Sequence, residues 1–136
     1  MKKEKLIRKA SLGFVALSSL SILAVSAMAF VSPQSVMDLV AVKLTNTDAV
    51  SSIRGIYGGA GLTIVIALVY LSRKDIRESL AFLILLWGLY ALSRMITWMT
   101  DGPLGDFGTQ WILLESIFCG IGMLLWMNEH RKPVES

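Results

Sequence analysis

Residues 49–71, AVSSIRGIYGGAGLTIVIALVYL, form an apolar run that carries one arginine and four glycines near its start. An α-helix rises about 1.5 Å per residue, so roughly 20 residues cross a hydrocarbon core about 30 Å thick. The run is therefore long enough to span a membrane as one helix. Polar side chains do not recur at every turn, as they do on the outer face of a soluble helical bundle.

Three further apolar blocks lie at 10–31, 80–100 and 111–127, the last near the short limit for a span. The 136-residue chain is 54% hydrophobic with a mean hydropathy of +0.64, above the ~45–50% apolar content of soluble domains. We predict an all-α integral membrane protein, a single domain over residues 1–136. Its four transmembrane helices, at about 10–31, 49–71, 80–100 and 111–127, are expected to form a compact up-down bundle.

A shorter helix is expected between the first two spans. Ser32 is a suitable N-cap, and Pro33 suits the first helical position. Apolar residues then recur at helical spacing, namely Val36, Met37, Val40 and Leu44. We predict a short amphipathic helix over residues 33–44, lying at the outer membrane interface.

The basic residues predict the orientation. Ten of the 13 fall on one side of a four-span arrangement: Lys2, Lys3, Lys5, Arg8, Lys9, Arg73, Lys74, Arg77, Arg131 and Lys132. By the positive-inside rule both termini of this multi-pass protein are expected to be cytoplasmic. Because the placement of these charges indicates the orientation of the helices in the membrane, the net charge of +3 does not indicate a nucleic-acid partner.

The N-terminal segment has a second interpretation. Its basic start, its apolar run and Ala27-Met28-Ala29 imitate a signal peptide with a cleavage site. The apolar run is longer than a typical signal-peptide core, and its removal would leave three spans with a mismatched charge pattern. We expect the helix to be retained, and cleavage stays open.

Single copies of Cys119 and His130 leave no intramolecular disulfide and no Cys/His metal centre. We therefore expect no metal and no cofactor.

Three ionisable residues lie within predicted spans: Arg54, Arg94 and Glu115. Counting from the span ends, each sits roughly 6–9 Å below the outer surface. A charge inside a span costs on the order of 3 kcal/mol, so such residues usually face partners or a wet cavity. We predict one shared polar site, with Glu115 ionised and paired with Arg94 or Arg54. The alternative is that both arginines extend to the interface separately.

Neighbouring residues add to this predicted site. Gly55 and Gly59, with Gly58 and Gly61, predict close helix packing that brings Arg54 and Tyr57 towards other helices. One face of the third span carries Trp87, Tyr90, Arg94 and Trp98. Tyr90 lies one turn from Arg94 and is expected to hydrogen-bond into the same cavity. The positive excess is expected to be screened by Asp101 and Asp106, in the outer link, or to be completed by an anionic ligand.

The order R-G-x-Y-G-G (54–59), Arg94, D-G-P (101–103) and Glu115 resembles a bacterial family of small four-helix membrane proteins of unknown function. A more distant likeness is to DoxX-like proteins. The resemblance implies a four-helix fold and singles out Arg54, Tyr57, Arg94, Asp101 and Glu115, without an activity.

Three functions compete. The first is binding of a membrane lipid headgroup or small anionic amphiphile in the outer cavity. The second is an accessory or structural membrane subunit whose ion pairs only stabilise it. The third is a proton-transfer or isomerase enzyme with Glu115 as the candidate catalytic residue. A homo-oligomer, through Gly120 and Gly122 or through the small-residue face of the first span, and a larger membrane complex both stay open.

Overall fold

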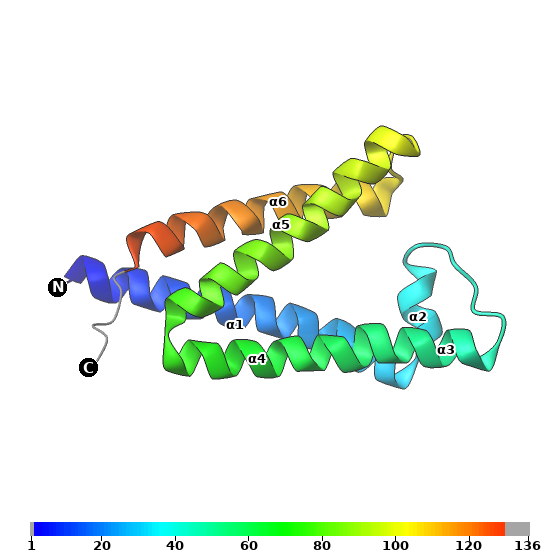
Figure 1. Ribbon diagram of the computed structural model, residues 1–136, viewed down its shortest axis with the longest axis horizontal. Helices are drawn as coiled ribbons and strands as arrows, with labels where there is room; N and C mark the ends of the chain where they lie inside the picture. Colours follow the sequence, from blue (N-terminus) through cyan, green and yellow to red (C-terminus); the bar gives the residue numbers. More distant parts are fainter. Residues whose placement is uncertain (1, 130–136) are drawn as a thin grey trace. The chain divides into compact units, whose positions relative to one another are not determined.

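The computed structural model describes residues 2–129 and is built from helices (Figure 1). These are α1 (Lys2–Val31), α2 (Pro33–Asp38), α3 (Thr47–Ile53), the π-helical segment η1 (Arg54–Ala60), α4 (Gly61–Lys74), α5 (Ile76–Thr100) and α6 (Asp106–Asn128). The segments α3, η1 and α4 run on as one helix, Thr47–Lys74. His130, Arg131 and Lys132, which entered the sequence predictions, lie outside the described residues.

Within residues 2–129, four helices are long and apolar enough to cross a membrane: α1, the composite helix Thr47–Lys74, α5 and α6. Each contains most or all of one predicted span and extends beyond it at one or both ends. Large apolar side chains lie on their outer surfaces; Leu20, Leu85 and Leu124 are each 64% exposed. A water-soluble helical protein would cover such surfaces, whereas lipid tails are themselves apolar. The predicted all-helical class is confirmed for the described residues, which contain no strand.

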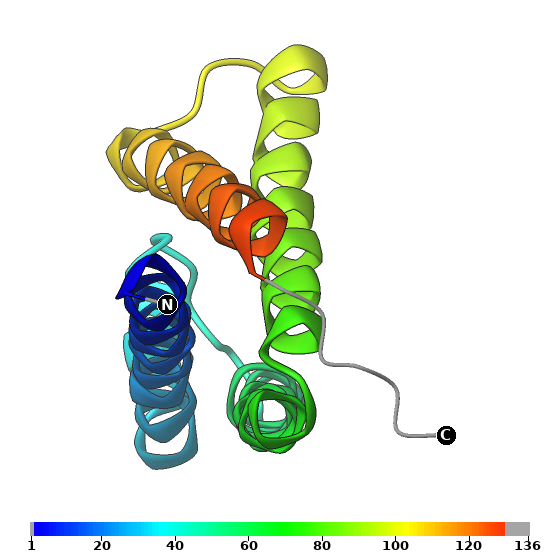
Figure 2. The same ribbon diagram turned by 90° about the vertical axis from the view of Figure 1, so that its left-hand side faces the viewer.

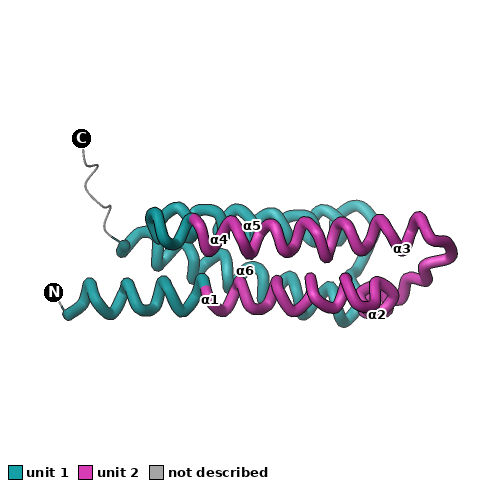
Figure 3. The backbone as a smooth tube through the Cα atoms, turned by 90° about the horizontal axis from the view of Figure 1, so that it is seen from below, with its two compact units in different colours: residues 1–15, 71–136 teal, residues 16–70 magenta. Residues whose placement is uncertain are grey.

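The chain divides into two compact units, residues 1–15 with 71–136 and residues 16–70 (Figure 3). In the first unit, α5 and α6 are antiparallel neighbours joined by the link 101–105 (Figures 1 and 2). Asp75 is the N-cap of α5, because its side chain accepts a hydrogen bond from the Arg77 amide at 3.0 Å. It is the one residue that separates α4 from α5.

Aromatic packing joins the start of α1 to α5 and α6 within this first unit. The ring of Phe118 lies 5.7 Å from that of Phe14 and 5.2 Å from that of Trp87, both edge to face. A Cβ on Gly122 would lie 3.0 Å from the Ile84 side chain. Gly122 is therefore packed inside the unit, and oligomerisation through α6 stays a prediction.

The second unit contains the rest of α1, α2 and most of the composite helix. Its core consists of Ala29, Val36 and Met37, with Val25, Leu44 and Ile53 packed against it. Two residues of the predicted amphipathic stripe, Val36 and Met37, are thus buried, whereas Val40 is 47% exposed.

The predicted helix over 33–44 is wrong in its length, because α2 ends at Asp38. The Val42 amide donates to the Met37 carbonyl at 3.0 Å and the Ala41 amide to the Asp38 carbonyl at 3.2 Å. With Ala41 at φ 56°, this is a Schellman closure. Glycine or asparagine usually occupies this left-handed position, and alanine gave no stop signal in the sequence.

The π-helical segment Arg54–Ala60 coincides with the glycine-rich start of the second predicted span. π-Helical turns are rare and often accompany functional sites. Here the Ser26 hydroxyl donates to the Gly58 carbonyl at 2.6 Å, and a Cβ on Gly61 would lie 3.2 Å from the Ser26 Cβ. Close packing therefore occurs at Gly58 and Gly61. A Cβ on Gly55 or Gly59 would meet no described residue within 4 Å, so the expected packing at these two positions stays a prediction.

Candidate binding site at the Arg94–Glu115 pair

An ion pair between α5 and α6 forms the centre of the candidate site. Arg94 Nε donates to Glu115 Oε2 at 2.8 Å, and Arg94 Nη2 donates to Glu115 Oε1 at 2.9 Å. The side chain of Glu115 is 2% exposed and that of Arg94 is 22% exposed. This is the bidentate geometry in which a planar guanidinium matches a carboxylate best. The predicted pairing of Glu115 is confirmed, with Arg94 as its partner.

The antiparallel hairpin explains why these two positions meet. Arg94 lies about two turns before the end of α5, and Glu115 about two and a half turns after the start of α6. With only five residues in the link, the two positions come to similar heights along the hairpin. Neither charge is left without a partner, which is what burial in a low-dielectric surrounding requires.

Phe107 is a further residue of the site that the sequence analysis missed. The guanidinium carbon of Arg94 lies 5.6 Å from the centre of the Phe107 ring, within cation–π range. Phe107 also packs against Trp111, with ring centres 5.9 Å apart. The spacing in the sequence indicated that Phe107 belongs to the site, because residues 107, 111 and 115 are four apart and share one helical face.

Two other predicted site residues of this unit lie on α5 and at its end. The ring of Tyr90, 46% exposed, lies 6.4 Å from that of Trp87. Asp101 is exposed and accepts a hydrogen bond from the Thr100 hydroxyl at 2.7 Å. Its carboxylate makes no ion pair with Arg94 within residues 2–129. That Asp101 screens the charge of Arg94 stays a prediction.

Arg54 and Tyr57 lie in the other unit. Arg54 Nε donates to the Phe30 carbonyl at 3.2 Å, in the last turn of α1. The carbonyls of a last helical turn have no partner in their own helix, so this bond satisfies one of them. Tyr57 is 37% exposed. That Arg54 and Tyr57 share one site with Arg94 and Glu115 stays a prediction.

The chemistry available at the pair follows from the unused edge of the guanidinium. Arg94 Nη1 makes no hydrogen bond or ion pair with any described residue. Both oxygens of Glu115, in contrast, accept hydrogen bonds from Arg94, so this geometry gives no support to general acid or base catalysis. Among residues 2–129, no group of three or more His, Cys, Asp or Glu side chains could hold a metal ion.

Comparison with known proteins gives one finding. A family model described as "Domain of unknown function (DUF4345)" matches residues 11–126. No curated protein and no solved structure gives a significant match. The predicted membership of a family of unknown function is confirmed, and the likeness to DoxX-like proteins stays a prediction.

Proposed function

The chain belongs to the family described as Domain of unknown function (DUF4345), and from this premise we propose that it is a membrane protein that binds a lipid headgroup or small anionic amphiphile at Arg94. The observation that carries the proposal is the half-used guanidinium. One edge of Arg94 is fixed by Glu115 and its face by Phe107, while Nη1 is left without a partner among residues 2–129. A phosphate or carboxylate group accepts hydrogen bonds from such an edge.

The apolar surroundings favour an amphiphile over a fully polar ligand. Because Glu115 neutralises Arg94, net charge at the pair does not attract an anion strongly. Binding would combine directed hydrogen bonds at Nη1 with contacts to neighbouring aromatic rings, those of Phe107 and Trp111. A molecule with one acidic group and an apolar body meets both requirements.

The proposal includes an arrangement in the bacterial inner membrane. The four long helices would run up and down as a bundle with both termini cytoplasmic, and α2 would lie at the outer interface. The concentration of basic residues at the chain ends and around Arg73, Lys74 and Arg77 supports this orientation.

A structural role is the second candidate function, and one observation favours it. Glu115 is 2% exposed and both of its oxygens are satisfied by Arg94, so the pair is complete without a ligand. An accessory membrane subunit held together by such a pair would carry no bound molecule.

Mass spectrometry of the purified protein separates these two functions. We expect a co-purifying acidic amphiphile in the parent protein and a loss of about tenfold or more in Arg94→Lys. Lysine keeps the charge but lacks the planar fork that binds Glu115 and a ligand together. The matched control is Arg73→Lys, an exposed arginine at the end of α4 that should leave occupancy unchanged. A parent protein with no bound amphiphile would favour the structural role.

A further inference from the structure

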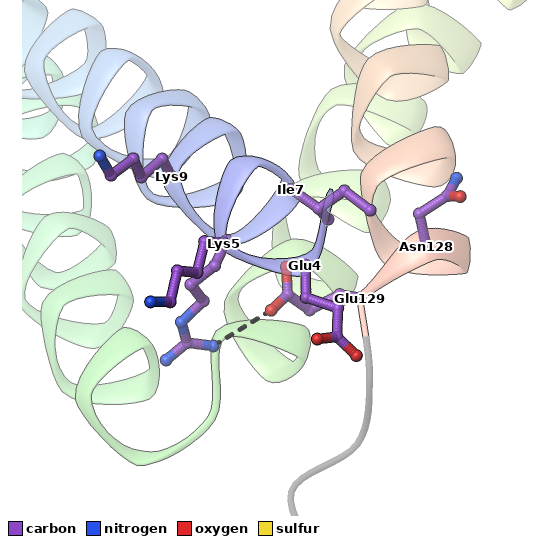
Figure 4. A pocket seen from close by; sticks show the side chains of 7 residues that line it. Glu4, Lys5, Ile7, Lys9, Asn128 and Glu129 are labelled. Atoms are coloured by element: carbon purple, nitrogen blue, oxygen red, sulfur yellow. Dashed lines mark hydrogen bonds and ion pairs between the residues drawn. The ribbon is translucent and has the colours of Figure 1, made fainter. Parts of the chain in front are cut away.

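A second cluster of charged residues lies in the same unit, at the end where α1 begins and α6 ends. A pocket of about 450 Å³ lies there, and Figure 4 shows the side chains that line it. It is lined by Glu4, Lys5, Ile7, Arg8, Lys9, Asn128 and Glu129. Glu129, the C-cap of α6, lies 14 positions after Glu115, which corresponds to about 21 Å along the helix axis. This basic pocket is therefore separate from the Arg94–Glu115 site.

A buried carboxylate holds the wall of the basic pocket in place. Glu129, 8% exposed, accepts a hydrogen bond from the buried Ser11 hydroxyl at 2.7 Å. It also pairs with Arg8 Nη1 at 3.4 Å, the ion pair that the dashed line marks in Figure 4. Arg77 fixes the same chain end from α5, because its Nη1 donates to the carbonyls of Trp126 and Glu129. The guanidinium of Arg77 also lies 4.3 Å from the centre of the Trp126 ring. The first turns of α1 and the end of α6 are thus tied together around the pocket.

The described residues that line the pocket carry a net positive charge. Three of them are basic, Lys5, Arg8 and Lys9, and two are acidic, Glu4 and Glu129. Glu129 is already paired with Arg8. Lys5 and Lys9 make no ion pair or hydrogen bond within the described residues. They are the ammonium groups available to an anion.

The walls of the pocket are mostly apolar. Among the described residues that line it, Ile7 is the single apolar one. Much of this apolar surface must therefore come from the methylene groups of the lysine and arginine side chains, which keep their charged ends at the rim. A pocket with apolar walls and a cationic rim at a membrane face matches a phospholipid, whose phosphate meets the rim and whose glycerol and acyl carbons meet the walls.

We infer that this basic pocket binds the phosphate-bearing headgroup of an anionic phospholipid, with Lys5 and Lys9 as the principal contacts. Glu129 acts as the positioning residue that holds Arg8 and closes α6 against α1. The site does not depend on the proposed function of Arg94. The positive-inside rule assigns this end to the cytoplasmic leaflet, where acidic lipids concentrate.

Native mass spectrometry in a neutral detergent, with phosphatidylglycerol and phosphatidylcholine as probes, tests the inference. Lys5→Gln/Lys9→Gln should lower phosphatidylglycerol binding about 30-fold, since each basic residue contributes about 1 kcal/mol near an anionic headgroup and 1.4 kcal/mol corresponds to tenfold. The matched control is Lys2→Gln/Lys3→Gln, which removes two charges from the same helix outside the pocket lining and should change binding less than twofold. Glu129→Gln should weaken binding and leave the preference for phosphatidylglycerol over phosphatidylcholine intact.

Three outcomes would overturn the inference. Equal losses in both lysine pairs would mean that diffuse charge attracts the lipid. Equal binding of phosphatidylcholine by the parent protein would mean that the headgroup charge is not recognised. Displacement of the lipid by millimolar inorganic phosphate would identify free phosphate as the ligand. Arg94→Lys should leave phosphatidylglycerol binding at the basic pocket unchanged, so failure of the Arg94 proposal can be recognised separately.

Discussion

At the scale of single residues, loss of Arg94 and loss of Glu115 should lower the stability of the protein by different amounts. Glu115 is short and 2% exposed, whereas Arg94 is 22% exposed. An arginine that loses its partner can extend its long side chain towards a polar surface, but a short carboxylate cannot. Removing the arginine should therefore harm the protein more than removing the glutamate.

The prediction is that Arg94→Met lowers the free energy of unfolding by about 3 kcal/mol, the typical cost of leaving a buried charge unpaired. Glu115→Leu should cost less, and Arg94→Met/Glu115→Leu should recover part of the loss caused by Arg94→Met alone. Thermal unfolding in detergent measures all three variants. Lys43→Met, an exposed basic residue, is the control and should melt like the parent protein. Strictly additive losses in the double variant would contradict an energetic coupling between the two side chains.

The sequence predicted a pairing of Glu115 but not which arginine provides it. The cost of an isolated charge in a span is a property of residue type and depth, and both can be counted along the chain. The partner depends on the rotation of each helix about its axis, which an apolar pattern on all sides does not encode. Glu129 was missed for a related reason, since a glutamate beside a basic tail resembles a solvent-exposed residue until Ser11 and Arg8 are seen to contact it.

At the scale of helices, the glycines of the composite helix make a second test possible. A Cβ on Gly61 would lie 3.2 Å from the Ser26 Cβ, and Ser26 is 1% exposed. The Ser26 Cβ is fixed to its helix backbone, so an added methyl group must push the two helices apart. That movement would also stretch the 2.6 Å hydrogen bond from Ser26 to the Gly58 carbonyl.

We expect Gly61→Ala to lower the free energy of unfolding by about 1 kcal/mol or more, as overpacking does. Gly59→Ala is the matched control, two residues away with nothing within 4 Å of its added Cβ. It should be neutral or stabilising, because alanine has the higher helix propensity. Melting temperatures in the same detergent decide the matter. Stabilisation by both substitutions would mean that the contact at Gly61 is not a close packing contact.

The sequence predicted the positions of the helices that depend on the length of an apolar run. It did not predict the features that depend on local hydrogen bonds. The long apolar blocks predicted all four long helices. The end of α2 was missed because Ala41 takes a left-handed conformation that its residue type does not favour. The π-helical segment was also missed, since the bond that accompanies it comes from Ser26, 32 positions earlier in the chain.

At the scale of the whole molecule, charge and hydropathy predict how the chain lies in a membrane. The four helices that could cross a membrane have link segments of very different charge. Arg73, Lys74 and Arg77 surround the break at Asp75, whereas the link 101–105 carries Asp101 and no basic residue. The insertion machinery retains basic links on the cytoplasmic side, so these two links should lie on opposite sides.

The resulting prediction is that both termini are cytoplasmic and the link 101–105 is on the outer side. Two separate fusions after Ser136 test this. Alkaline phosphatase is active only outside the cytoplasm, whereas green fluorescent protein fluoresces only when it folds inside the cytoplasm. The fluorescent fusion should be bright and the phosphatase fusion inactive. The control is the same pair of fusions after Gly105, where the activities should reverse because three spans precede that point. An active phosphatase after Ser136 would contradict the four-span orientation. Cleavage of the first helix would be recognised separately, as a mature protein that begins beyond Ala29.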